Sequence, residues 1–118
     1  MANTTIETVK PLIYEIGDKT YTLEFSRNSV KFAESIGLTM SAVTEMETPV
    51  TTIPLLFFAA FKMHHPEISR ADADRILVED LGGIERDELR RLIELYCSPT
   101  TSLFHSEGAE RKNVKVSF

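Results

Sequence analysis

The most apolar stretch of the chain, residues 53–65, organises the fold that we expect. If this stretch is helical, its side chains are apolar on nearly every side. Pro54 in the first turn, with Thr51 and Thr52 before it, marks the start of a helix, and Pro66 marks its end. A helix that is apolar all round must be buried, in its own domain or under a partner. It is too short to span a membrane, which takes about 20 apolar residues. We therefore predict a core helix, an interface helix or both over residues 53–64.

The segment before it, residues 12–25, has the pattern of a β-hairpin. Tyr21, Leu23 and Phe25 alternate with polar residues, which is the period of a half-buried strand. The Gly17–Asp18 pair suits a tight turn, because glycine adopts the positive φ that such turns need. A lone hairpin is marginally stable in water, so one of its faces must pack on helices.

Capping signals and apolar spacing predict four further helices, at residues 27–36, 40–46, 70–81 and 85–98. Thr39 caps the second of these helices, and a Ser69–Asp72 capping box begins the third. Gly37 ends the first and Pro99 ends the fourth. The last two should form an antiparallel pair around Gly82–Gly83. The predicted fold class is mainly α (α+β), with an N-terminal β-hairpin packed on a bundle of four to five helices. Residues 1–104 form one domain. Residues 105–118 are expected to be a flexible C-terminal tail, although alternating Val114, Val116 and Phe118 also fit a strand that adds to a sheet edge.

Length and composition narrow the class of protein. The 118 residues match one domain on the usual scale of about 100–200 residues. A net charge of −5 favours solubility and disfavours binding to nucleic acid or to an anionic membrane. A single cysteine, Cys97, cannot form an intramolecular disulfide, and the N-terminal residues do not resemble a signal peptide. We expect a protein of the cytoplasm.

Few residues of the chain are candidates for a metal site or a catalytic site. His64 and His65 are the first place to look for a metal, but neighbouring residues on a helix point about 100° apart and cannot share one face. We expect them to be cations near a helix C-terminus, where the dipole is negative. Cys97, next to Tyr96 on an amphipathic helix, resembles a small buried apolar residue. We expect no catalytic residue, no metal and no cofactor, and therefore no enzyme.

The apolar helix is the best candidate for a binding surface. Its simplest interpretation is the core of a monomer, and the sharper one is that part of its surface meets another chain. Methionine and phenylalanine together suit a groove that accepts varied apolar helices. The two interpretations are compatible, since a small domain has few elements to cover the helix. The predicted partner-binding residues are Leu56, Phe57, Phe58, Phe61 and Met63.

The order of these features also matches a known pattern. It lies in YEIGDKTYTLEFSR at 14–27, VKFAESIG at 30–37, LLFFAAFKMHHP at 55–66 and LIELY at 92–96. Over residues 14–104 the chain resembles the small tail assembly chaperones of long-tailed (siphovirus-type) phages and prophages of Gram-positive bacteria.

This resemblance implies a non-enzymatic protein of the bacterial cytoplasm that binds and solubilises the tape measure protein during tail tube assembly. The tail tube protein is a second candidate partner, and weak self-association is expected. The resemblance carries no residue-level motif. The alternative is a small regulatory adaptor or inhibitor that binds one globular protein partner.

Overall fold

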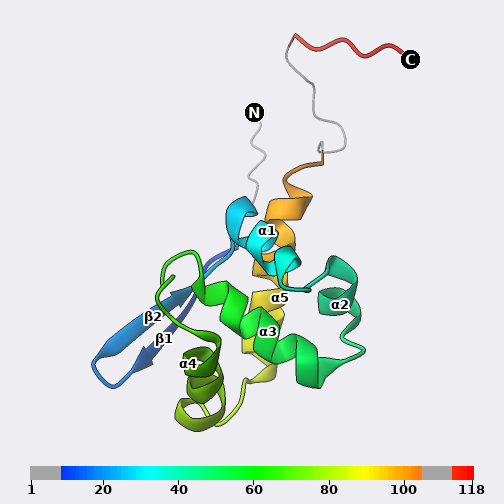
Figure 1. Ribbon diagram of the computed structural model, residues 1–118. Coiled ribbons are helices and arrows are strands. Elements are labelled where there is room, and N and C mark those ends of the chain that lie inside the picture. The colour runs from blue at the N-terminus through cyan, green and yellow to red at the C-terminus, as the bar shows by residue number, and fades with distance from the viewer. Residues whose placement is uncertain (1–8, 105–112) are drawn as a thin grey trace.

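The computed structural model describes residues 9–104 and 113–118. These form a two-stranded antiparallel hairpin and five α-helices, so the predicted α+β class with its N-terminal hairpin is confirmed (Figure 1). The elements are β1 (Leu12–Ile16), β2 (Lys19–Leu23), α1 (Arg27–Ser35), α2 (Met40–Glu45), α3 (Pro49–Phe61), α4 (Arg70–Arg75), the π-helical turn η1 (Ile76–Asp80) that continues α4, and α5 (Arg86–Thr101).

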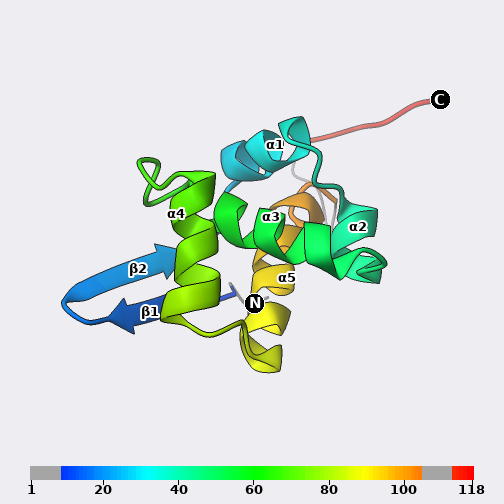
Figure 2. The ribbon, with the colours of Figure 1, turned by 60° about the horizontal axis from the view of Figure 1, so that its bottom comes forward.

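Helix α3 lies at the centre of the fold. Helices α1, α2, α4 and α5 and strand β2 all pack against it (Figures 1 and 2). Its fully or almost fully buried side chains cover most of the circumference of the helix, and they are Thr52, Leu55, Leu56, Phe57, Ala59, Ala60 and Phe61. The apolar stretch is therefore the core of its own domain, as its lack of a polar face requires.

The start of α3 differs from the prediction. The helix begins at Pro49, about one turn before Pro54, so Pro54 lies inside it. Pro49 costs nothing there, because the first N–H groups of a helix have no partner within the helix. Pro54 withholds a hydrogen bond from the carbonyl of Val50. Val50 is 88% exposed, and solvent can hydrate the carbonyls of this first turn.

The hairpin forms as its sequence predicts. Ile16 pairs with Lys19 across the Gly17–Asp18 turn, and Gly17 has a φ of +64°. Because the turn has two residues, Thr22 is a position whose N–H points away from β1. That N–H donates to Nε2 of His65 at 3.0 Å, and two residues later the N–H of Glu24 donates to the carbonyl of Ala60 at 3.1 Å. The outer edge of β2 is thereby joined to the end of α3.

Aromatic rings form the other half of this junction. Phe57 and Phe61, one turn apart on α3, lie 5.1 Å from each other between ring centroids. Tyr14 packs 6.1 Å from Phe57, and Tyr21 packs edge-on 5.6 Å from Phe61. Both strands therefore place a tyrosine on the same face of α3.

The predicted helix caps are confirmed where the signal is local. The side chain of Ser26 caps α1, that of Thr39 caps α2, and Ser69 with Asp72 forms a capping box at the start of α4. Each cap satisfies an N–H group that the helix itself leaves unpaired.

Two expectations about the last helices are wrong. Helix α5 runs on through Pro99 to Thr101, because a proline there removes only one hydrogen bond of the last turns while its ring is buried. The predicted antiparallel pair of α4 and α5 is not the main contact of α4, which packs chiefly on α3. The all-apolar surface of α3 offers α4 more area to bury.

The expected C-terminal tail is described only in part. Residues 105–112 lie outside the described residues, as do residues 1–8 of the predicted domain. Residues 114–118 are exposed and have no helix or strand, so Val114, Val116 and Phe118 pair with no sheet edge. Within residues 9–104 and 113–118, none of the helices combines the length and the apolar character needed to cross a membrane.

We expect Phe57→Ala to lower the free energy of unfolding by about 3–5 kcal/mol, because it opens a cavity under the hairpin. Urea unfolding followed by circular dichroism measures this loss. The control is Val50→Ala on the exposed start of the same helix, which should change stability by less than about 0.5 kcal/mol. Similar losses for both variants would contradict the central role of α3.

Candidate helix-binding surface

The structure divides the five predicted partner-binding residues into two groups. Leu56, Phe57 and Phe61 are at most 1% exposed, so they form the core and present no surface to a partner. Phe58 is partly exposed, and Met63, just after α3, is 42% exposed. The five residues therefore do not meet on one surface, and a role in partner binding stays a prediction for Phe58 and Met63.

A weak signal in the sequence does mark the exposed side of α3. Thr51, Phe58 and Lys62 lie on one stripe of the helix, since they are separated by seven and four residues. Thr51 and Lys62 are both exposed, and Phe58 lies between them. The polar residues at the two ends of the stripe identify Phe58, rather than Phe57, as the phenylalanine nearest to solvent.

Phe58 borders a groove between α3 and α4. The groove has a volume of about 280 Å³, and its lining residues are Pro54, Phe58, Arg70, Ala71 and Asp74. On the other side of Phe58, Phe32 of α1 packs edge-on at 5.9 Å between ring centroids. Three helices therefore meet around this partly exposed ring. We call these residues, together with Lys62, the Phe58 surface.

Two cations lie over the aromatic rings of this surface. Nζ of Lys62 is 4.7 Å from the centroid of Phe32, and the guanidinium carbon of Arg70 is 6.0 Å from the centroid of Phe58. Such contacts are favourable because the face of an aromatic ring is electronegative. Among the described residues, neither Lys62 nor Arg70 forms an ion pair.

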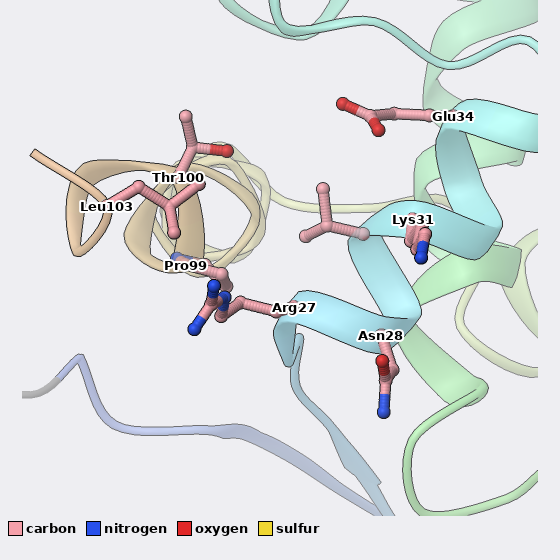
Figure 3. Close-up of a pocket in the computed structure, with 8 residues that line it drawn as sticks. Arg27, Asn28, Lys31, Glu34, Pro99, Thr100 and Leu103 are labelled. Carbon is pink, nitrogen blue, oxygen red and sulfur yellow. The ribbon is translucent and has the colours of Figure 1, made fainter.

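A second groove, of about 370 Å³, lies between α1 and the C-terminal end of α5 (Figure 3). Thr100 and Leu103 lie on the side of this groove that is opposite α1. Its lining residues are Arg27, Asn28, Val30, Lys31, Glu34, Pro99, Thr100 and Leu103. Leu103 is 59% exposed, and Phe104, the next residue in the chain, is 74% exposed. This end of α5 is therefore a second apolar surface, separated from the Phe58 surface by α1.

The family of the chain can be stated here. The model of a domain of unknown function, DUF5055, matches residues 1–118. The chain belongs to this family. No curated protein and no solved structure matches it. DUF5055 carries no stated function, so the chemistry of this member is argued from its own residues.

The two histidines have structural partners in this DUF5055 protein. Nε2 of His64 lies 2.8 Å from Oε1 of Glu24, and Nε2 of His65 accepts the N–H of Thr22. A nitrogen that accepts a hydrogen bond carries no proton, so His65 is a neutral acceptor here rather than the expected helix-terminus cation. Within the described parts of the chain, no three His, Cys, Asp or Glu side chains are grouped as a metal site requires.

Cys97 is half-buried, and its Sγ lies 3.3 Å from Sδ of Met40. Burial raises the pKa of the Cys97 thiol, which lowers the fraction of reactive thiolate. The contact is that of a small apolar residue between α5 and α2.

Tyr96 carries a buried hydroxyl that has no hydrogen-bond partner among the described residues. Its ring packs edge-on against Phe25 at 5.2 Å. Burial, and then the negative charge of Glu34, raise the pKa of Tyr96 to about 12. The ring is needed for packing, whereas the hydroxyl group lies where an apolar atom would suit better.

We expect Tyr96→Phe to leave the free energy of unfolding unchanged or to raise it by about 1 kcal/mol at pH 7. The unfolded phenol ionises near pH 10, and the folded one only near its pKa of about 12. Folding therefore favours the neutral phenol, and the parent should lose stability as the pH rises from 10 to 12, more than Tyr96→Phe does.

The matched control for this variant is Tyr14→Phe. The hydroxyl of Tyr14 donates to Oε1 of Glu88 at 2.9 Å, so its removal should destabilise the fold by about 1 kcal/mol. Chemical denaturation at pH 7 and across pH 9–12 measures both effects. A clear loss of stability in Tyr96→Phe at pH 7 would contradict the assignment of an unpaired hydroxyl.

We expect His65→Leu to lower the free energy of unfolding by about 1–3 kcal/mol, because it leaves the half-buried N–H of Thr22 without its acceptor. His64→Leu removes a more exposed contact with Glu24 and should cost less than about 1 kcal/mol. Urea unfolding compares the two variants, and amide exchange at Thr22 should accelerate only in the first. Equal effects in both measurements would argue against the junction between β2 and α3.

Proposed function

We propose that this protein is a phage tail assembly chaperone, without enzymatic activity, that binds the tape measure protein and keeps it soluble. The proposal rests on the resemblance of residues 14–104 to that class. The observation that carries it is the Phe58 surface, where a partly exposed aromatic ring borders a groove between two helices. The proposed ligand is an amphipathic helix of the tape measure protein.

The shape and size of this surface suit reversible shielding. An amphipathic helix binds a groove through apolar side chains spaced three or four residues apart. A long helix with an apolar stripe aggregates when it is free, and a soluble protein that covers part of the stripe opposes this by mass action. The Phe58 surface is small, so each chaperone covers a short segment and is displaced when tail tube subunits assemble.

The contacts of the titratable residues favour binding over catalysis. His65 accepts a backbone hydrogen bond, and Asp72 forms a capping box with Ser69. The hydrogen bonds from Ser69 and then the charge of Arg75 lower the pKa of the Asp72 carboxyl. These side chains stabilise local structure and do not converge on a common point. We extend the proposal to the cytoplasm of the bacterial host, to the tail tube protein as a second partner, and to weak self-association.

The second candidate function is that of a regulatory adaptor or inhibitor. It is favoured by the groove between α1 and α5, which Leu103 lines together with Arg27 and Glu34, and by the exposed side chain of Phe104 next in the chain. A mixed apolar and charged surface of this kind suits a single globular partner. The position of the gene separates the two candidates, since a tail assembly chaperone should lie between the tail tube and tape measure genes.

We expect Phe58→Gln to weaken binding of the tape measure protein by about thirtyfold or more, because truncating a central interface anchor typically costs about 2 kcal/mol. Co-expression with the tape measure protein followed by pull-down tests this, after circular dichroism has shown that the variant is folded. Two controls use exposed apolar residues elsewhere, Val50→Gln on α3 and Phe104→Gln at the end of α5.

Each outcome separates the candidates. Loss of binding in Phe58→Gln alone supports the chaperone and this groove. Loss in Phe104→Gln alone moves the site to the groove between α1 and α5. If the parent protein neither binds the tape measure protein nor keeps it soluble, the proposed function is wrong.

A further inference from the structure

The Phe58 surface has a charge opposite to that of the whole protein. The chain has a net charge of −5, yet the two cations of this surface, Lys62 and Arg70, are exposed and form no ion pair among the described residues. Three other arginines of α4 and α5 differ in this respect. Arg75, Arg90 and Arg91 each lie within 4.0 Å of a carboxylate.

The two cations stand at the ends of one continuous row. Arg70 lies over Phe58, Phe58 packs edge-on against Phe32, and Lys62 lies over Phe32. The residues of the row come from α4, α3 and α1, so its geometry is set by the packing of three helices. A ligand that covers the ring of Phe58 must therefore lie beside both cations.

This arrangement determines the chemistry of the ligand. Covering the rings would take water from the ammonium of Lys62 and the guanidinium of Arg70. Desolvating a charge is costly unless the ligand supplies an opposite charge or a hydrogen-bond acceptor. An entirely apolar helix would therefore bind poorly here, whereas a helix with carboxylates beside its apolar stripe would satisfy both cations.

The carboxylate of Asp74 affects which way the ligand helix lies in the groove. Asp74 lines the groove one turn after Arg70 on α4. The negative charge of Asp74 repels the carboxylates of an acidic ligand at this end of the groove. The carboxylates of the ligand should consequently meet Arg70 and the side of the row that carries Lys62, and an uncharged or basic residue should lie near Asp74.

We propose that the Phe58 surface selects an acidic amphipathic helix, in which Asp or Glu residues border the apolar stripe and contact Lys62 and Arg70. The inference deepens the proposed function and rests on it for the identity of the partner. Two exposed cations on an acidic protein give little attraction for a polyanion, so a helix of protein fits this surface better than nucleic acid does.

The test uses the full chain and synthetic peptides tiled across the predicted helices of the tape measure protein. Affinity is measured by fluorescence anisotropy at low and high NaCl. The double variant Lys62→Glu, Arg70→Glu should bind the best peptide at least tenfold more weakly. Exchange of the peptide's Glu and Asp for Lys should restore its binding. The matched control is Lys19→Glu, Arg86→Glu, which makes the same change in net charge at exposed sites on the hairpin and at the start of α5.

A variant with the opposite expected effect is Asp74→Asn. It removes the repulsive carboxylate and should strengthen binding of the acidic peptide by between about two- and fivefold at low salt. Unchanged or weaker binding in this variant would contradict the proposed orientation.

The outcomes distinguish this inference from the proposed function. If no tape measure peptide and no whole tape measure protein binds the parent, the proposed function fails. If the parent binds and Phe58→Gln does not, but the Lys62→Glu, Arg70→Glu variant binds as the parent does, the function stands and the selection of an acidic helix is overturned. Equal losses in the Lys19→Glu, Arg86→Glu control would also overturn it, as would equally tight binding of a 20-base-pair DNA duplex.

Discussion

The need to bury the apolar side chains of α3 is the constraint on which the rest of the structure depends. A helix without a polar face cannot lie on a surface, so other elements must surround it. The elements that do so are weak by themselves. Helices α2 and α4 have six residues each, and a two-stranded hairpin is marginal in isolation. Each gains its stability by covering part of α3, which makes the fold a single cooperative unit.

The junction between β2 and α3 adds a polar requirement to this apolar one. The outer edge of β2 would otherwise present unpaired N–H groups, which invite association with other strands. The carbonyl of Ala60 and the imidazole of His65 accept two of them. His65, a residue type that often binds metal, thereby positions the hairpin on the end of α3.

Between Leu55 and Phe61, coverage of α3 is least complete at Phe58, where α1 and α4 approach from opposite sides. The ring is held by Phe32 on one side and bordered by a groove on the other. A surface built on the most buried helix of the domain is rigid, and little ordering of the protein is needed when a ligand binds. The same rigidity fixes Lys62 and Arg70 beside the rings, so apolar contact and charge recognition are linked at one place.

Local features of the sequence determined much of this fold. The hairpin turn follows from Gly17, and the starts of α1, α2 and α4 follow from Ser26, Thr39 and Ser69, because a turn or a cap depends on residues within three or four positions. The burial of α3 could also be predicted, since its composition leaves no polar side.

Only the tertiary structure decided which residues of α3 reach solvent. Thr51 and Lys62 give only a weak indication of the exposed stripe, and the contacts of α3 were needed to place Phe57 under the hairpin and Phe58 at the surface. The partners of His64 and His65 were equally hidden, because Thr22 lies on β2 and Glu24 just after it, some 40 residues earlier. Pro54 and Pro99 lie inside helices rather than at their ends, because packing against neighbouring elements outweighed the loss of a single hydrogen bond.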